Sequence, residues 1–307
     1  MLRNRDFGLH CSVYAFTRDS QQAAKRFAFW GTTPYLHFVE GDVNQSSNYP
    51  APLKFDYVLH LASNTHPVAY ATDPIGTITA NIIGTRNMLD FASKCSAQRF
   101  VFASSNEIYG ENRGDQELFD ESYLGYIDCN TLRAGYPESK RCGEAMCQAY
   151  RSQEGLDTVI ARLTRSFGPS LKLSDSKAST QFLKNGLNQE DIVLKSAGTQ
   201  YYSYTYTVDA VTGLLTILLK GKKGDAYNIA DTSCDIQLKD FAQIVAKKSG
   251  TSVIFDLPSS VEAVGFSKAT KARLDGSKLS SMGWRPYFSI EEAIQRTLIV
   301  LKESINS

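Results

Sequence analysis

The chain has 307 residues, 42% of them hydrophobic, and its formal net charge at pH 7 is +1. This length and composition predict a globular protein with one large or two modest domains. The near-neutral charge gives no electrostatic basis for binding nucleic acid or an anionic membrane. No apolar run approaches the roughly 20 residues that span a bilayer, and no charged-then-apolar signal opens the chain.

The cysteines stand at positions 11, 95, 129, 142, 147 and 234, without a C-x-x-C pair, and the chain has four histidines. This pattern does not suit a metal site, so we expect none. Reduced thiols are typical of a cytosolic protein, and we therefore expect a cytoplasmic location.

Strand-like and helix-like segments alternate along the first half of the chain. We expect strands near residues 12–17, 36–39, 57–61, 99–103 and 157–162. This alternation predicts an α/β fold with a doubly wound parallel sheet. After Pro169 the pattern becomes irregular, which indicates a smaller α/β domain over residues 169–307. A strand near residues 226–230 would return from it to the large sheet of residues 1–168.

A tyrosine and a lysine are the strongest catalytic candidates. Tyr136 and Lys140 are four residues apart, so a helix would place them on one face. The ammonium of Lys140 would favour the phenolate and lower the pKa of Tyr136 from its ordinary value near about 10. Such a phenol can take a proton from an alcohol while hydride leaves the same carbon. The alternative is an ordinary exposed helix pair.

Two hydroxyls and a carboxylate lie upstream of this pair. The apolar run 99–103 ends in Ser104 and Ser105, followed by Asn106 and Glu107. A buried parallel strand would present these side chains at its carboxyl end. That edge of an open α/β sheet is where ligands bind.

Several ordered motifs resemble those of the extended short-chain dehydrogenases, the NAD-dependent epimerase/dehydratase family that acts on nucleotide sugars. The motifs are H-L-A-S at 60–63, N-x-x-G-T at 81–85, S-S-N-E-I-Y-G at 104–110, Y-P-E-S-K-R at 136–141, S-F-G-P at 166–169, Y-T-V-D at 206–209 and M-G-W-R-P at 282–286. Within the family the chain is most similar to UDP-glucuronate decarboxylases. The resemblance implies a Rossmann-type domain, a sugar-nucleotide domain and a cytoplasmic homodimer formed by helices near 81–94 and 136–151.

The start of the chain differs from the family. A Rossmann domain opens with a strand and a glycine-rich turn that holds a pyrophosphate at a helix N-terminus. No such turn is found here, and residues 1–10 are predicted to form the back half of the first helix. Two interpretations stay open: a start placed too late or a gene fragment, and a member that has lost cofactor binding.

The resemblance implies NAD as cofactor, with NADP as the alternative. Thr17 and Arg18 stand where NAD users carry an acid, and an uncharged residue followed by arginine suits a 2′-phosphate. Asp42, followed by Val43, is the expected adenine contact. The other cofactor-binding residues that the resemblance implies are Leu61, Ala62, Ser63, Asn81, Ser104, Tyr136 and Lys140.

The implied reaction begins with oxidation of the sugar at C4. Tyr136 would act as base, Lys140 would lower its pKa and orient the ribose, and Ser105 would bond the reacting oxygen. Asn106 replaces the acid of dehydratases, whereas Glu107 stays available for a C5 proton or a decarboxylation intermediate. UDP-glucuronate decarboxylation is predicted first, C4 epimerisation next and 4,6-dehydration third. The alternative from another class is a non-catalytic homologue.

The expected substrate is a UDP-linked sugar used to make glycan precursors. Three positions differ from decarboxylase relatives. Where this chain has Tyr202, the relatives carry an arginine that holds the substrate diphosphate. They have an asparagine in place of Arg165, and in place of Ser170 an arginine that binds the sugar carboxylate. These changes predict a different sugar, a relocated cation or a decayed site. The predicted substrate-binding residues are Arg165, Ser166, Lys172, Gln200, Tyr202 and Arg273.

Overall fold

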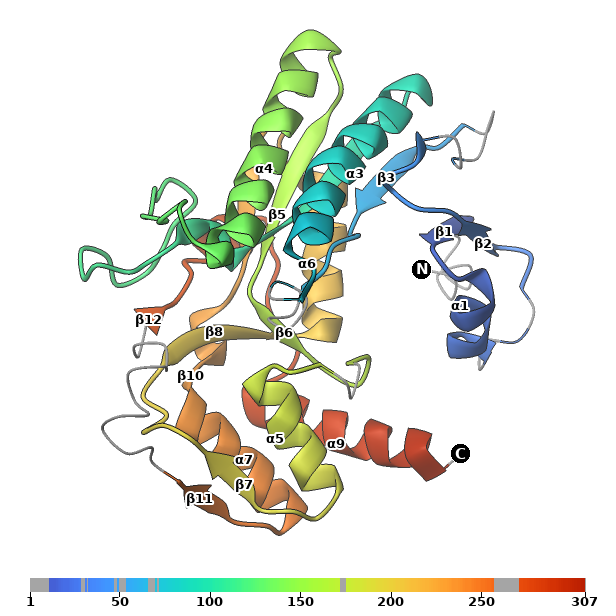
Figure 1. Ribbon diagram of the computed structural model, residues 1–307. Helices are drawn as coiled ribbons and strands as arrows, with labels where there is room; N and C mark the ends of the chain where they lie inside the picture. The colour runs from blue at the N-terminus through green and yellow to red at the C-terminus, as the bar shows by residue number, and fades with distance from the viewer. Residues whose placement is uncertain are drawn as a thin grey trace.

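The computed structural model describes residues 11–28, 31, 33–46, 49, 54–65, 70, 72–171, 175–256 and 271–306 (Figure 1). Residues 1–10, where a half-helix is predicted, lie outside these ranges. The first half consists of β1 (Val13–Thr17), α1 (Ser20–Arg26), β2 (Leu36–Glu40), β3 (Tyr57–His60), α3 (Pro74–Lys94), β4 (Arg99–Ser105), α4 (Gly135–Gln153) and β5 (Thr158–Leu163). All five predicted strands are confirmed, with ends within two residues of the expected ones.

The strands of the first half, together with β9, form two separate parallel sheets. β1 pairs with β2, and a four-stranded sheet has the order β3-β4-β5-β9, with β9 at Ala226–Ile229. β9 is the predicted return strand, and it is parallel to β5. Among the described residues no strand joins β1 to β3, so the sheet is not continuous.

β4 is the centre of the large core because helices cover both of its faces. Phe100 and Phe102 are fully buried and pack with side chains of α3 and α4, which lie side by side in Figure 1. Val101 points the other way and packs under α6 (Thr207–Lys220) with Ile217. A strand buried on both faces carries a continuous apolar run, which explains the pattern at 99–103.

Most of the remaining elements build a second core around β8 (Tyr201–Tyr206), whereas α6, β9 and α8 (Ser277–Ser280) pack in the large core. β8 pairs in parallel with β6 (Arg165–Phe167) and β12 (Lys271–Ala272), and antiparallel with β10 (Asp235–Gln237). The other elements are α5 (Ala178–Leu187), β7 (Ile192–Leu194), α7 (Leu238–Ser249), β11 (Val253–Phe255) and α9 (Ile290–Asn306). Phe182, Phe241 and Ile294 fill this core from three helices. The domain boundary at residue 168 stays a prediction.

Within the described ranges, none of the helices is both long and apolar enough to cross a bilayer.

Candidate active site

Four of the predicted catalytic residues meet where β4 ends and α4 begins. Ser105 is the last residue of β4, and Glu107 lies in the 3₁₀ turn η4 (Asn106–Tyr109) that follows. Tyr136 and Lys140 occupy the first two turns of α4, and both are buried. The hydroxyl of Ser105 lowers the pKa of Tyr136, although less than burial raises it. Asn106, the fifth predicted residue, is half-buried in the same turn as Glu107.

The ionisation of Tyr136 differs from the prediction. The pKa of Tyr136 is raised to about 12, first because the side chain is buried and then because Glu107 is negatively charged nearby. The ammonium of Lys140 lies 6.0 Å from the centroid of the Tyr136 ring and donates to the carbonyl of Ala103 at 2.9 Å. The expected lowering of this pKa by Lys140 is therefore wrong for this structure, because burial raises the pKa and Lys140, which donates to Ala103, is not among the groups that lower it.

Two residues that were not predicted complete the surroundings of the phenol. The ring of Tyr70 stacks on that of Tyr136, with centroids 4.7 Å apart and planes 23° apart. Arg133 pairs with Glu107 at 2.8 Å, and its guanidinium lies 5.0 Å from the centroid of the Tyr70 ring. The positive charge of Arg133 lowers the pKa of Tyr136, although less than burial raises it.

Only one of these two residues left a signal in the sequence. Arg133 stands three residues before Tyr136, a spacing that places side chains close together at a helix start. Tyr70 is far from both in the sequence, and only the tertiary fold brings it to the site.

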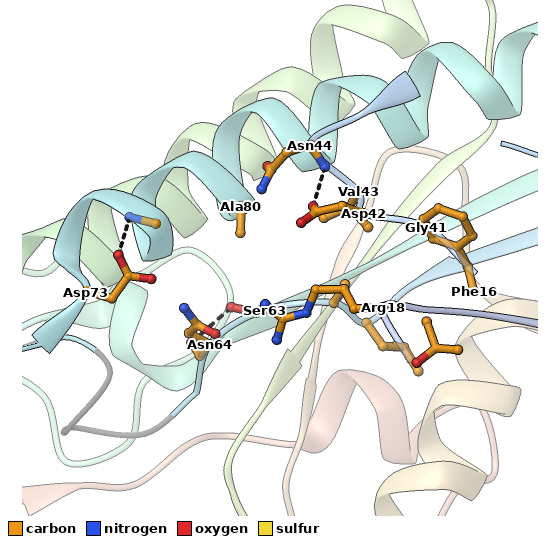
Figure 2. Close-up of a pocket in the computed structure, with 14 residues that line it drawn as sticks. Phe16, Arg18, Gly41, Asp42, Val43, Asn44, Ser63, Asn64, Asp73 and Ala80 are labelled. Atoms are coloured by element: carbon orange, nitrogen blue, oxygen red, sulfur yellow. Dashed lines mark hydrogen bonds between the residues drawn. The ribbon is translucent and has the colours of Figure 1, made fainter. Parts of the chain in front are cut away.

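A cavity of about 450 Å³ opens at the carboxyl ends of β1, β2 and β3 (Figure 2). Its lining includes seven of the predicted cofactor-binding residues: Thr17, Arg18, Asp42, Val43, Leu61, Ala62 and Ser63. Asn44, which was not predicted, also lines it, and so do Asp73, Gly76 and Ala80 at the start of α3. The structure thus brings together polar side chains that follow three strands, as expected for a ligand site in an open α/β fold.

Four other predicted cofactor-binding residues, Asn81, Ser104, Tyr136 and Lys140, do not line this cavity. Asn81 is fully buried and accepts from the hydroxyl of Ser63 at 2.7 Å. Its amide donates to Ser139, the neighbour of Lys140, at 2.9 Å. Asn81 therefore links the cavity wall to the helix that carries the catalytic pair. Its direct contact with a cofactor stays a prediction.

The donors and acceptors in the cavity fit the nucleoside end of a dinucleotide. The Asp42 carboxylate accepts from the backbone amide of Asn44 at 2.8 Å. The side-chain oxygen of Asn44 is buried without a hydrogen-bond partner, which is costly unless a ligand donates to it. Arg18 is exposed at the same site and suits a phosphate. No glycine-rich strand-to-helix turn for a pyrophosphate occurs in the described ranges.

The predicted substrate-binding residues fall into two groups. The guanidinium of Arg165 lies 3.6 Å from the centroid of the Tyr202 ring, and one of its terminal nitrogens is buried without a hydrogen-bond partner. Arg273 instead stacks on Tyr201 at 4.7 Å. Because neighbouring residues of a strand point to opposite faces, Arg165 and Arg273 lie on opposite sides of β8.

Arg273 is also neutralised by two carboxylates, at 2.6 Å from Glu117 and 3.7 Å from Asp235. Arg165 and Arg273 therefore do not form a common substrate site in this structure. Gln200 has a buried side-chain oxygen without a hydrogen-bond partner, and Ser166 is exposed. Lys172 lies outside the described residues.

Fold and site together define an α/β protein with a ligand cavity at the carboxyl ends of its strands and a buried Tyr-Lys pair beside it. Residues 4–230 match the NAD dependent epimerase/dehydratase family. The chain therefore belongs to this family, as the motifs predicted.

The curated relatives it resembles include two UDP-glucuronic acid decarboxylases. The enzyme of Xenopus tropicalis is 29% identical over 263 residues, which is 86% of this chain and 61% of the relative. The enzyme of Danio rerio is 30% identical over 257 residues, 83% of this chain and 59% of the relative. The chain thus spans about three-fifths of the length of these two relatives.

Solved structures of similar fold include a dTDP-glucose 4,6-dehydratase from Streptomyces venezuelae, determined with NAD. Its TM-score is 0.82 at 22% identity, with 99% of this chain and 93% of that chain covered. A UDP-glucuronic acid 4-epimerase from Bacillus cereus, in complex with UDP-glucuronic acid and NAD, has a TM-score of 0.82 at 20% identity and the same coverage. At these identities the similarity confirms the Rossmann-type fold.

Proposed function

We propose that this chain is an NAD-dependent enzyme that modifies a nucleotide sugar through oxidation at C4. UDP-glucuronate decarboxylation is the first candidate, because the decarboxylases are the relatives described above. The observation that carries the proposal is the meeting of Tyr136, Ser105 and Glu107 at the end of β4, beside the cavity that follows β1, β2 and β3. NADP is the alternative cofactor, since Arg18 suits a 2′-phosphate.

The cofactor would be held in the cavity by Asp42, Asn44 and Ser63, with Arg18 at its phosphate. When bound, NAD supplies the acceptor for the hydride that leaves C4. As a phenolate, Tyr136 would take the proton of the C4 hydroxyl, so its own proton must leave before this step. Ser105 would donate to the reacting oxygen and hold it beside Tyr136.

Glu107 separates the possible later steps. Its carboxylate is ion-paired with Arg133 at 2.8 Å, which holds it close to the phenol that faces the sugar. From there it can take a C5 proton or serve a decarboxylation intermediate. C4 epimerisation, which needs only Tyr136 and its partners, is the second candidate. Dehydration is third because Asn106 cannot donate a proton as an acid.

Arg165 on the ring of Tyr202 is the proposed contact with the negative charge of the substrate. The unpartnered buried nitrogen of Arg165 suits a phosphate or carboxylate oxygen. Arg165 would then take the role of the arginine that decarboxylase relatives carry at the position of Tyr202. Ser166, Lys172 and Gln200 remain proposed contacts.

A cytoplasmic homodimer built on α3 and α4 is also proposed. Ile75 and Ile83 on α3 are 78% and 42% exposed, and a second copy would cover them. Leu89 on the same helix is fully buried in the core of the chain itself.

The experiment has two stages. Calorimetry first measures binding of NAD and NADP to the 307-residue chain. UDP-glucuronate and UDP-glucose are then offered with the preferred cofactor; mass spectrometry detects loss of CO₂ or of water, and chromatography separates a 4-epimer, which has the mass of its substrate. Tyr136→Phe should bind the cofactor as well as the unchanged chain does and lose turnover by at least about 100-fold.

Absence of binding of both dinucleotides would contradict the proposal and leave the non-catalytic homologue in its place. Binding with loss of water as the only reaction would replace decarboxylation and epimerisation by dehydration.

A further inference from the structure

A buried ion pair lies one helical turn beyond the catalytic lysine. Glu144 follows Lys140 by four residues on α4, and its side chain is only 13% exposed. Its two carboxylate oxygens accept from Arg162 on β5, at 3.1 Å from Nε and 2.7 Å from Nη2. The hydroxyl of Ser104 donates to the same carboxylate at 2.5 Å. Neither Glu144 nor Arg162 has a role in the proposed reaction.

The surroundings of Lys140 disfavour its charged form. Its Nζ is hydrogen-bonded to the carbonyl of Ala103 and lies 5.0 Å from the centroid of the Phe102 ring. An ammonium buried in this way loses its hydration, and the pKa of Lys140 is lowered to about 8, with burial as the first cause. Glu144 lies one helical turn from Lys140 on α4, and it accepts from Ser104, the residue next to the Ala103 carbonyl that accepts from Lys140. At this position its negative charge is the largest influence that raises the pKa of Lys140.

The other titratable groups around Lys140 cannot replace this carboxylate. The pKa of Cys147, one helical turn beyond Glu144, is raised by burial, so its thiol stays neutral. His60 on β3 is also neutral, because burial lowers its pKa to about 3. Tyr136 remains a protonated phenol, and Arg162 on β5 carries a charge of the same sign as Lys140. Among the described residues acting on the charge of Lys140, Glu144 is the one carboxylate.

We propose that Glu144 is a positioning residue that keeps Lys140 protonated at neutral pH, and that Arg162 and Ser104 hold its carboxylate in place. The inference rests on the proposed function only in its consequence for catalysis, since Lys140 acts there as a cation. The competing view is that Glu144 serves only as the counter-ion of the buried Arg162.

The test follows the titration of Lys140 directly. Lysine labelled with ¹³C and ¹⁵N is incorporated, and the Lys140 signal is assigned by its loss in Lys140→Met. Glu144→Gln removes the charge, and its amide oxygen can still accept from Ser104 and from Nε of Arg162, whereas the bond from Nη2 is lost. The titration midpoint of Lys140 should fall by at least about one pH unit, because the variant loses the negative charge one helical turn away. Glu138→Gln is the matched control.

Glu138 lies on the same helix and is 34% exposed, with Arg141 as its partner. Its substitution should leave the Lys140 midpoint unchanged, which excludes a general effect of removing one negative charge from α4. Glu144→Asp keeps the charge but withdraws it by one methylene, so its midpoint should lie between those of the unchanged chain and Glu144→Gln. This variant decides the matter if Glu144→Gln does not fold.

An unchanged Lys140 midpoint in folded Glu144→Gln, or in Glu144→Asp where only that variant folds, would overturn the proposal. The titration needs neither cofactor nor sugar, so it stands even if the proposed function fails. Where turnover is observed, the alkaline loss of activity should shift to lower pH in Glu144→Gln, because Lys140 would then lose its proton earlier.

Discussion

Replacing Arg165 with methionine would test whether this arginine binds the negative charge of the ligand. Methionine keeps an unbranched apolar side chain but removes the guanidinium, which lies 3.6 Å from the centroid of the Tyr202 ring. A hydrogen bond to a charged group contributes about 1.5–3 kcal/mol. Since about 1.4 kcal/mol corresponds to a tenfold change in affinity, the Kd of UDP should rise about 10- to 150-fold.

The free energy of unfolding should change little in this variant. Loss of the cation–π contact costs about 0.5–2 kcal/mol. Removal of a buried donor without a partner gains about 1–3 kcal/mol, which offsets the loss. A binding defect without a stability defect is therefore the expected signature of a ligand-binding arginine.

Calorimetry with two ligands and one control variant completes the assay. Uridine lacks the diphosphate, so Arg165→Met should leave its affinity unchanged. Arg273→Met removes a guanidinium on the opposite face of β8, where Glu117 and Asp235 already neutralise it, and should leave the affinity for UDP unchanged. Equal losses for UDP and uridine, or an unchanged Kd for UDP, would refute the reasoning.

Two further predictions concern stability. Burial lowers the pKa of His60 from 6.5 to about 3, so on acidification the imidazole takes up a proton in the unfolded chain before it does in the folded one. The contribution of His60 to the free energy of unfolding should therefore be fully present above pH 6.5. It should fall toward pH 3 by up to about 1.4 kcal/mol per pH unit. The Tm of His60→Gln should be less sensitive to pH over that window, and equal slopes would exclude His60 as the cause. A Cβ at Gly143 would lie 2.4 Å from Cζ of Phe102, so Gly143→Ala should lower the free energy of unfolding in urea by about 1–3 kcal/mol. Alanine otherwise stabilises a helix relative to glycine, and a more stable variant would show that the ring moves aside.

The sequence alone determined the features that depend on local periodicity and spacing. The apolar run that ends in Ser104 and Ser105 predicted β4 because a strand buried on both faces must be apolar throughout. The spacing of Tyr136 and Lys140 placed them on one face of a helix, which is α4, and the return strand β9 was visible as a short segment near residues 226–230. Ordered motifs identified the family because their combination is far more specific than each motif alone.

Long-range packing decided what these patterns could not show. Tyr70 reaches Tyr136, and Arg133 reaches Glu107, through contacts between segments whose separation no periodicity encodes. The position of Arg273 opposite Arg165 depends on strand register, because a shift of one residue exchanges the two faces of a strand.

The direction of the Tyr136 pKa is the clearest example. A Tyr-Lys spacing predicts that the charge lowers it, whereas burial raises it to about 12. The sequence determines which charged groups can be neighbours along a helix. How much water the folded chain excludes from them is decided by residues from every surrounding element, and desolvation is the larger effect here.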